Sequence, residues 1–191
     1  MSSSTMYIEV DQADLKYINN KLSSAKTNAN KVLRNAINRT ATVALKQIKA
    51  GRTKGYTISA SRFNGEIKVQ RANAAHLDAT ITAKGSTHTL MHFRTTFPKK
   101  GGKANVAKEG LKKLVSSKGG AAFIPTAGQL SGIMAQRQSS SQYPLKAFQA
   151  PSTPKMVEQI WTGEHGGQTN LPNTVQERLH TEIMAEVAKI I

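Results

Sequence analysis

Two histidines have the spacing of a metal site on a helix. His88 and His92 are four residues apart, and ligands at that spacing share one face of a helix. The residues around them, however, follow the pattern of a strand, in which four residues separate two side chains by roughly 13 Å. One ion cannot bind both ligands across that distance. We therefore interpret these histidines as surface or partly buried side chains and not as metal ligands.

Other chemistries lack the residues that they need. Between residues 15 and 157 the only acids are Glu66, Asp78 and Glu109, in separate expected elements, whereas a two-metal nuclease gathers its carboxylates. The glycine pair before Lys103 lacks the spacing of a phosphate-binding loop, and no serine lies in a nucleophile elbow. The chain has no cysteine, which excludes disulfides and thiolate metal sites. We predict no catalytic, metal-binding or cofactor-binding residues, and we expect that the protein is not an enzyme.

Charge is the most informative feature of the composition. The 191 residues carry a formal net charge of +16. Residues 15–157 hold 25 of the 27 Lys and Arg residues, whereas eight of the 11 acids lie in residues 1–14 and 158–191. This excess is larger than solubility requires. It indicates a surface for nucleic acid or for an acidic protein, and the charge alone does not choose between them.

The densest basic stretch is a Lys- and Gly-rich segment at 98–120, which we expect to form a loop or a long hairpin. Its candidate contacts to DNA or to an acidic partner are Lys99, Lys100, Lys103, Lys108, Lys112, Lys113 and Lys118. Such a cluster binds phosphates regardless of base sequence. No zinc-finger, RNP-type aromatic or basic-zipper pattern accompanies it. The alternative, that these lysines are solvated or meet acids of a neighbouring chain, stays open.

One long amphipathic helix is predicted over 11–51, with Asp11 as its N-cap and Gly51 at its end. Unbroken, it would be roughly 60 Å long, and we expect a bend or break near 28–30. Apolar and small residues recur every three or four positions and form one face. Such a helix usually packs against a sheet or a neighbouring subunit, and the candidate subunit-packing part of its face is Leu22, Ala25, Ala29, Leu33, Ala36, Thr40 and Ala44.

After residue 55 the hydrophobic period falls towards two, which is typical of strands. Strands are expected over 56–60, 66–72, 77–85, 87–97, 121–125, 133–138 and 143–150. A short helix is expected over 155–162. A final helix is predicted to start at Asn173 as N-cap, with one apolar face made of Val175, Leu179, Ile183, Val187 and Ile191.

This order predicts an α+β fold, in which a long N-terminal helix packs on a mainly antiparallel sheet and a C-terminal helix follows. Residues 1–10 are expected to form an arm whose first five residues lack regular structure. Residues 11–162 are expected to form a single domain, and residues 163–191 a linker and the C-terminal helix. No segment has the pattern of a signal peptide or a membrane span.

Four stretches occur in an order that matches a known family. They are Ala36-Ile37-Asn38-Arg39, Gly120-Ala121-Ala122-Phe123-Ile124, Ile133-Met134-Ala135-Gln136-Arg137 and Tyr143-Pro144-Leu145, followed by a segment around Pro151 and Pro154 and by the last helix. In this order and spacing the chain resembles the minor tail protein Z family of lambda-like tailed phages, which are head-proximal tail-completion proteins. Two features depart from the family: the last helix is more acidic, and the central Lys/Gly loop differs in sequence.

The resemblance implies a non-enzymatic structural protein of the virion, assembled in the host cytoplasm and located at the end of the tail that joins the head. The partners implied are further copies of the chain in a sixfold ring, the tail terminator and the neck or connector proteins, with no membrane. The lysine density adds the end of the packaged DNA as a partner hypothesis. A reading from another class is a stand-alone basic nucleic-acid-binding protein, for which a monomer with steeply salt-dependent binding would be expected.

Overall fold

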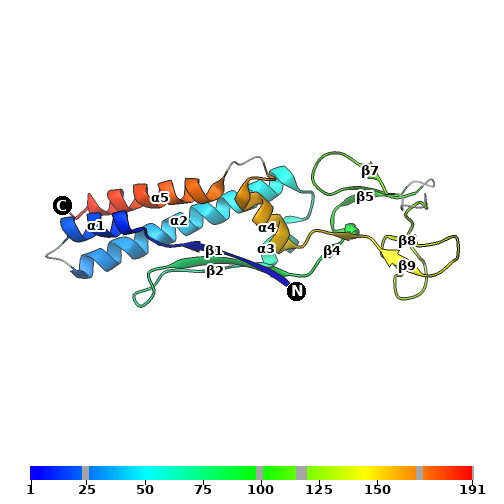
Figure 1. Ribbon diagram of the computed structural model, residues 1–191, viewed down its shortest axis with the longest axis horizontal. Coiled ribbons are helices and arrows are strands. Elements are labelled where there is room, and N and C mark those ends of the chain that lie inside the picture. The colour runs from blue at the N-terminus through cyan, green and yellow to red at the C-terminus, as the bar shows by residue number, and fades with distance from the viewer. Residues whose placement is uncertain (23–25, 98–100, 115–119, 167–169, 191) are drawn as a thin grey trace.

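The protein is an elongated molecule with two parts (Figure 1). The computed structural model describes residues 1–22, 26–97, 101–114, 120–166 and 170–190. Helices and a three-stranded sheet form the part that we call the body, whose described residues are 1–22, 26–93, 149–166 and 170–190. Short strands and loops form the other part, which we call the lobe, and its described residues are 94–97, 101–114 and 120–148. The chain therefore leaves the body after residue 93 and returns to it at residue 149.

Three helices run along the body: α1 (Gln12–Lys21), α2 (Lys26–Gly55) and α5 (Leu171–Val187). The Asp11 side chain caps α1 by accepting a hydrogen bond of 2.7 Å from the backbone N–H of Asp14, which satisfies one of the free donors of the first turn. Figure 1 shows that the chain reverses direction between α1 and α2, and that α5 then lies along α2.

The prediction of one helix over 11–51 is wrong in two respects. The helix is interrupted between Lys21 and Lys26, earlier than the expected bend at 28–30, because Leu22 leaves helical geometry and buries its side chain in the core. Gly51 does not end α2, which continues to Gly55. No capping turn is needed at Gly51, since the backbone there stays helical and packs against another helix.

The sheet has the order β1-β3-β2, with all pairs antiparallel. Its strands are β1 (Ser2–Ile8), β2 (Ile67–Gln70) and β3 (Ala79–Gly85). The expected strands at 66–72 and 77–85 are thus confirmed, and the second ends at Gly85 as predicted. The expectation that residues 1–5 lack regular structure is wrong, because residues 2–5 belong to β1 and pair with residues 82–85 of β3.

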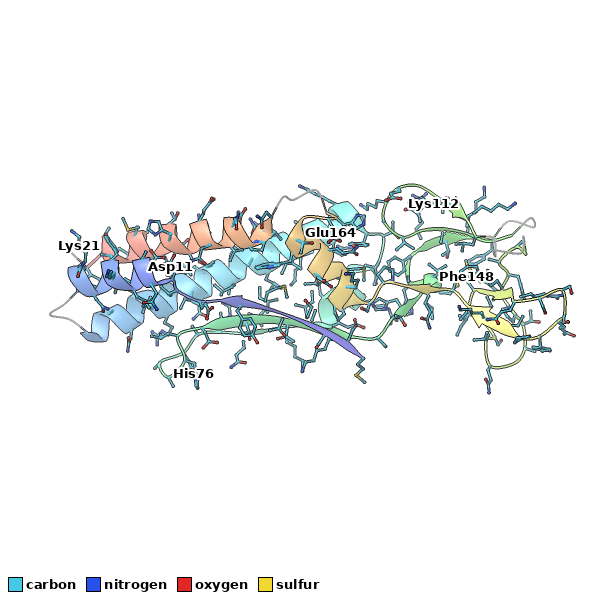
Figure 2. All side chains as sticks on the ribbon, viewed as in Figure 1. Asp11, Lys21, His76, Lys112, Phe148 and Glu164 are labelled. Carbon is cyan, nitrogen blue, oxygen red and sulfur yellow. The ribbon has the colours of Figure 1, made fainter. Side chains whose placement is uncertain are left out.

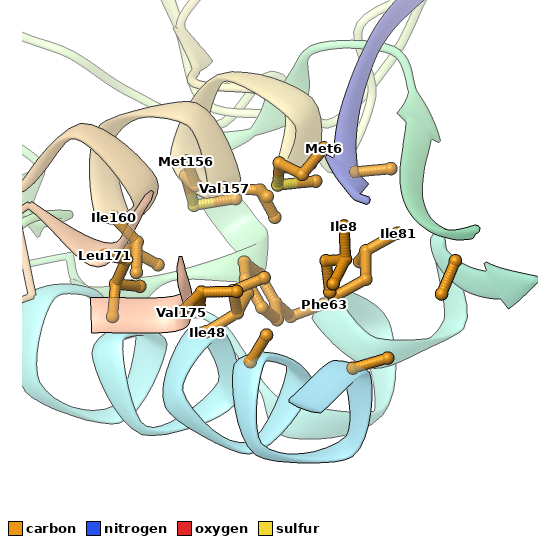
Figure 3. Close-up of a cluster of buried hydrophobic side chains, with 14 of the residues drawn as sticks. Met6, Ile8, Ile48, Phe63, Ile81, Met156, Val157, Ile160, Leu171 and Val175 are labelled. Carbon is orange, nitrogen blue, oxygen red and sulfur yellow. The ribbon is translucent and has the colours of Figure 1, made fainter. Parts of the chain in front are cut away.

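The core of the body lies between the sheet and the helices (Figure 3). Met6 and Ile8 of β1 and Ile81 of β3 face Ile48 of α2 and Val157 of α4 (Thr153–Thr162). All five side chains are buried. Alternation along the strands sends their apolar residues to this face and leaves the polar ones on the other face.

Residues 56–65 do not form the strand expected over 56–60. Tyr56 and Ile58 enter the core from a non-regular segment, and the short helix α3 (Ala60–Gly65) follows and buries Phe63. The Tyr56 hydroxyl donates to Gln159 Oε1 at 2.8 Å. The alternating pattern therefore arises from two buried side chains, Tyr56 and Ile58, and not from a strand.

The single strand expected over 87–97 is also wrong. It is divided into β4 (His88–Thr89), a 3₁₀ turn (Leu90–His92) and β5 (Arg94–Thr96). Leu90 and Phe93 are both buried at this turn, and their burial favours the bend in the chain.

The remaining strands are short. They are β6 (Lys103–Asn105), β7 (Lys112–Lys113), β8 (Ala135–Arg137), β9 (Leu145–Ala147) and β10 (Gln149–Ala150). β6 pairs with β7, as a hairpin in the basic segment predicts, and β8 pairs with β9. The strand expected over 121–125 is reduced to one bridge, between Phe123 and Ala135.

The C-terminal helix is confirmed, but it starts at Leu171 after Asn170, not after Asn173. Pro172 lies in its first turn, where a missing backbone N–H costs nothing. Val175, Leu179, Ile183 and Val187 are buried, as predicted; Ile191 lies outside the described residues. The fold is α+β. No helix in the described part of the chain is long and apolar enough to cross a membrane.

Candidate interaction surfaces

Four of the seven predicted lysines lie on the lobe with exposed side chains: Lys103, Lys108, Lys112 and Lys113. Lys108 Nζ donates to the backbone carbonyl of Thr53, near the end of α2, and Lys112 forms an ion pair with Glu109. Figure 2 shows Lys112 on the β7 side of the lobe. The other three predicted contacts, Lys99, Lys100 and Lys118, lie outside the described residues.

Two of these lysines are direct cross-strand neighbours. Lys103 of β6 is opposite Lys113 of β7, and like charges directly opposite each other destabilise a strand pair. Neither side chain forms an ion pair within the described residues. An anion that binds between them would relieve this repulsion, so the pair is a strong candidate contact for a phosphate or a carboxylate.

The lobe carries three further basic residues that the lysine pattern of the sequence did not predict as contacts. Arg94 on β5, Arg137 on β8 and Lys146 on β9 are exposed. The Arg137 guanidinium lies 5.7 Å from the centroid of the Phe123 ring, which orients it by a cation–π contact. The charge count contains the missing signal: residues 94–148 hold ten basic residues and one acid, Glu109.

The predicted subunit-packing face of the long helix is corrected by the structure. Leu22, Leu33, Ala36, Thr40 and Ala44 are each 5% exposed or less within the single chain, and Ala29 is partly buried. Ala25 lies outside the described residues. This face already packs against α5, the sheet and α4, so it is not free for a neighbouring subunit.

The two histidines that were expected to lie far apart meet at the junction of body and lobe. The 3₁₀ turn brings the centroid of the His92 ring to 5.5 Å from the centroid of the His88 ring, in an edge-to-face arrangement. His88 is 4% exposed. Its Nε2 lies 3.0 Å from Thr153 Oγ1 and 3.6 Å from Glu66 Oε2. The strand interpretation failed here because the turn folds one histidine back towards the other.

Burial is the main reason why the pKa values of both histidines are lowered. It lowers the pKa of His88, the Glu66 carboxylate opposes that effect, and the Arg62 guanidinium adds to it. Burial also lowers the pKa of His92, followed in effect by Arg62 and by His88. Both imidazoles are therefore neutral at pH 7. His92 Nδ1 and Glu66 Oε2 have no hydrogen-bond partner within the described residues.

These groups do not form a metal centre in the part of the chain that is described, where no set of three or more His, Asp or Glu side chains is placed to hold an ion. The His88–Glu66–Thr153 contacts instead join β4, the residue before β2 and the first turn of α4. A Cβ at Gly85 would lie 2.1 Å from Glu66 Oε2, so glycine there leaves room for the carboxylate. The cluster is thus a set of polar contacts that holds three elements of the body together next to the lobe.

Comparison with known proteins adds no family to this description. No protein-family model matches the chain, and neither a curated protein nor a solved structure is detectably similar to it.

Proposed function

We propose that the chain is a non-catalytic structural protein of a tailed phage, which acts at the head-proximal end of the tail and helps to join tail to head. The proposal starts from the colinear stretches that resemble the minor tail protein Z family. Copies of the chain form a ring, expected to be sixfold, whose neighbours are the tail terminator and the neck proteins.

The observation that carries the proposal is that the packed core and the concentrated basic charge lie in different parts of the molecule. The body holds the extended core, whereas the lobe projects from one end and carries seven basic residues against one acid in its described part. A rigid body suits a ring, and a projecting charged lobe suits contact with the next component. Complementary charge fixes partner and register more than raw affinity.

Three of the family-like stretches meet within this lobe. Phe123 pairs with Ala135 across an isolated bridge, and Arg137 pairs with Leu145 between β8 and β9. The stretches at 120–124, 133–137 and 143–145 are therefore neighbours in space although they are separated in sequence. Their proximity supports a single function for them.

The decisive experiment is electron cryo-microscopy of particles of the phage whose genome encodes this chain. A ring of copies at the head–tail junction, with lobes reaching an adjacent component, is the expected result. Absence of the chain from purified particles would exclude the tail role. The same map also identifies the component that contacts Lys103 and Lys113.

A second candidate function is stand-alone nucleic-acid binding, and the Lys103–Lys113 pair is the observation that favours it. In that case the purified protein binds DNA as a monomer, with an affinity that falls steeply with salt. A ring protein whose lobe meets an acidic protein would instead bind free DNA weakly. Binding isotherms at several salt concentrations therefore separate the two functions.

A further inference from the structure

Two surface hollows of unlike charge lie along helix α5. The first, which we call the arginine hollow, has a volume of about 540 Å³ and lies between α2 and α5; its lining includes Asn35, Arg39, Thr42, Arg71, Arg178 and Glu182. The second, which we call the acidic hollow, has a volume of about 500 Å³ and lies where α5 meets the start of α1; its lining includes Asp11, Asn173, Gln176, Glu177, His180 and Thr181.

Arg71 is held in place by neutral partners. The Asn38 side chain donates to the Ala72 carbonyl at 3.0 Å and accepts from the Ala72 N–H at 2.9 Å, which fixes the segment after β2 against α2. Arg71 Nη1 then donates to the Asn38 carbonyl at 3.1 Å and to Thr42 Oγ1 at 3.0 Å. Within the described residues no carboxylate pairs with this guanidinium.

The other two arginines share two nearly buried carboxylates. Arg39 Nη1 lies 2.7 Å from Glu186 and 3.5 Å from Glu182, and Arg178 also pairs with Glu182. Lys189 also pairs with Glu186. Three cations therefore pair with these two carboxylates, and Arg71 adds a fourth positive charge, which leaves the arginine hollow positive. Guanidinium groups bind carboxylates in a planar, two-point geometry, so this hollow suits a further carboxylate.

The acidic hollow offers carboxylates of the matching kind. Gln176 Nε2 donates to Asp11 Oδ2 at 3.3 Å, which places the Asp11 carboxylate beside α5. Glu177 is exposed, and its carboxylate makes no ion pair within the residues described. Asp14, behind this edge, is 1% exposed and pairs with His180 at 2.5 Å. Asp11 and Glu177 form what we call the acidic edge.

We propose that the arginine hollow of one copy receives the acidic edge of a second copy. The occupant is identified by charge complementarity, since the chain carries both surfaces, and the proposal rests on the self-assembly included in the proposed function. The two surfaces differ, so the contact is head-to-tail, and repetition closes a ring or extends a filament. The apolar face of α2 is used inside the chain, whereas the side of α2 that carries Arg39 and Thr42 remains available for a neighbour.

The test is charge reversal followed by sedimentation velocity at low salt over a range of protein concentration. Glu177→Lys and Arg71→Glu are each expected to weaken self-association about tenfold or more, because like charges meet. An equimolar mixture of the two variants is expected to regain association, since each reversed surface meets a complementary partner. Lys68→Glu, on the exposed face of the sheet, is the matched control and should associate as the wild type does.

Disulfide trapping gives an independent readout, because the natural chain has no cysteine. A mixture of Arg71→Cys and Glu177→Cys proteins is expected to form a cross-linked dimer under mild oxidation, whereas Lys68→Cys with Glu177→Cys is not. A wild type that stays monomeric, reversal variants that associate normally, or equal cross-linking in the control pair would each overturn the proposal.

The outcomes are separable from those of the proposed function. If the chain is found at the head–tail junction but Arg71 and Glu177 do not cross-link, this interface is wrong and the tail role stands. If the two positions cross-link but particles lack the chain, the interface stands and the tail role is wrong.

Discussion

Gly51 and Ile160 are in direct contact, with no room for a side chain between them: a Cβ at Gly51 would lie 2.4 Å from Ile160 Cγ2. Gly166 approaches the same point, since a Cβ there would lie 2.9 Å from Gly51 Cα and its φ is +91°. The glycine that looks like a helix stop in the sequence is therefore the place where α4 and the segment after it reach the backbone of α2.

This contact predicts that Gly51→Ala destabilises the protein although alanine favours helices. We expect a loss of about 1–3 kcal/mol in the free energy of unfolding, which is typical of overpacking a close contact. Urea denaturation, monitored by circular dichroism, measures this free energy of unfolding. Gly65→Ala is the control, because a Cβ there meets nothing within 4 Å. A Gly51→Ala protein as stable as the control would refute the close packing.

The histidine pair His88 and His92 predicts that the protein is less stable in mild acid. The pKa values of His88 and His92 are lowered in the folded state, whereas an unfolded histidine titrates near ~6.5. Between the two values the unfolded chain binds more protons, so stability is complete above about pH 6.5 and falls as the pH drops below it.

Urea midpoints at several pH values, together with NMR titration of the imidazole protons, test this expectation. His88→Gln should reduce the acid-dependent loss of stability, whereas His76→Gln, at an exposed position, should leave it unchanged. An identical pH dependence in the His88→Gln protein would show that the loss of stability arises elsewhere.

Asn38 is expected to be important for stability although it is a polar residue on a helix. Its side chain makes both hydrogen bonds to the backbone of Ala72, which is 6% exposed. Asn38→Ala leaves that N–H and carbonyl without their partners, at a cost of about 1–3 kcal/mol in unfolding free energy. Asn20→Ala, at an exposed position of α1, serves as control, and chemical denaturation of both variants gives the comparison.

If the lobe binds DNA, its lysines set the salt dependence. The triple variant Lys103→Gln, Lys112→Gln, Lys113→Gln should bind DNA more weakly, and the slope of log K against log salt should fall by about 0.9 for each lysine that contacts a phosphate. Fluorescence anisotropy with a labelled duplex measures both quantities. The same number of substitutions at the body lysines Lys16, Lys31 and Lys46 provides the charge-matched control; an equal loss there would mean that the lobe is not the binding surface.

The parts of the fold that could be predicted are those in which one face of an element is apolar. Val175, Leu179 and Ile183 recur with helical spacing, and Ile81 lies between alternating polar residues; both patterns survive in the structure because burial on one face causes them. The α+β class followed from the order of these segments.

The rest depended on contacts that sequence spacing does not record. The apolar period runs without a break through Leu22, Ala25 and Ala29, so it gives no sign that the chain reverses there. The 3₁₀ turn that joins His88 to His92 depends on packing of Leu90 and Phe93. The arginine hollow assembles residues from three separate segments, which no local motif brings together.

The attachment of the lobe has a consequence for how such a protein can diversify. His88 pairs with Ala150 and Thr89 with Gln149, so the segments of the body that lead into the lobe and out of it lie side by side. A segment whose ends meet in this way is in effect an insertion, and insertions of that geometry can change length or sequence without breaking the elements that flank them. Related chains can therefore keep the same body and its contacts while exchanging the lobe, so that one assembly unit is fitted to different neighbours.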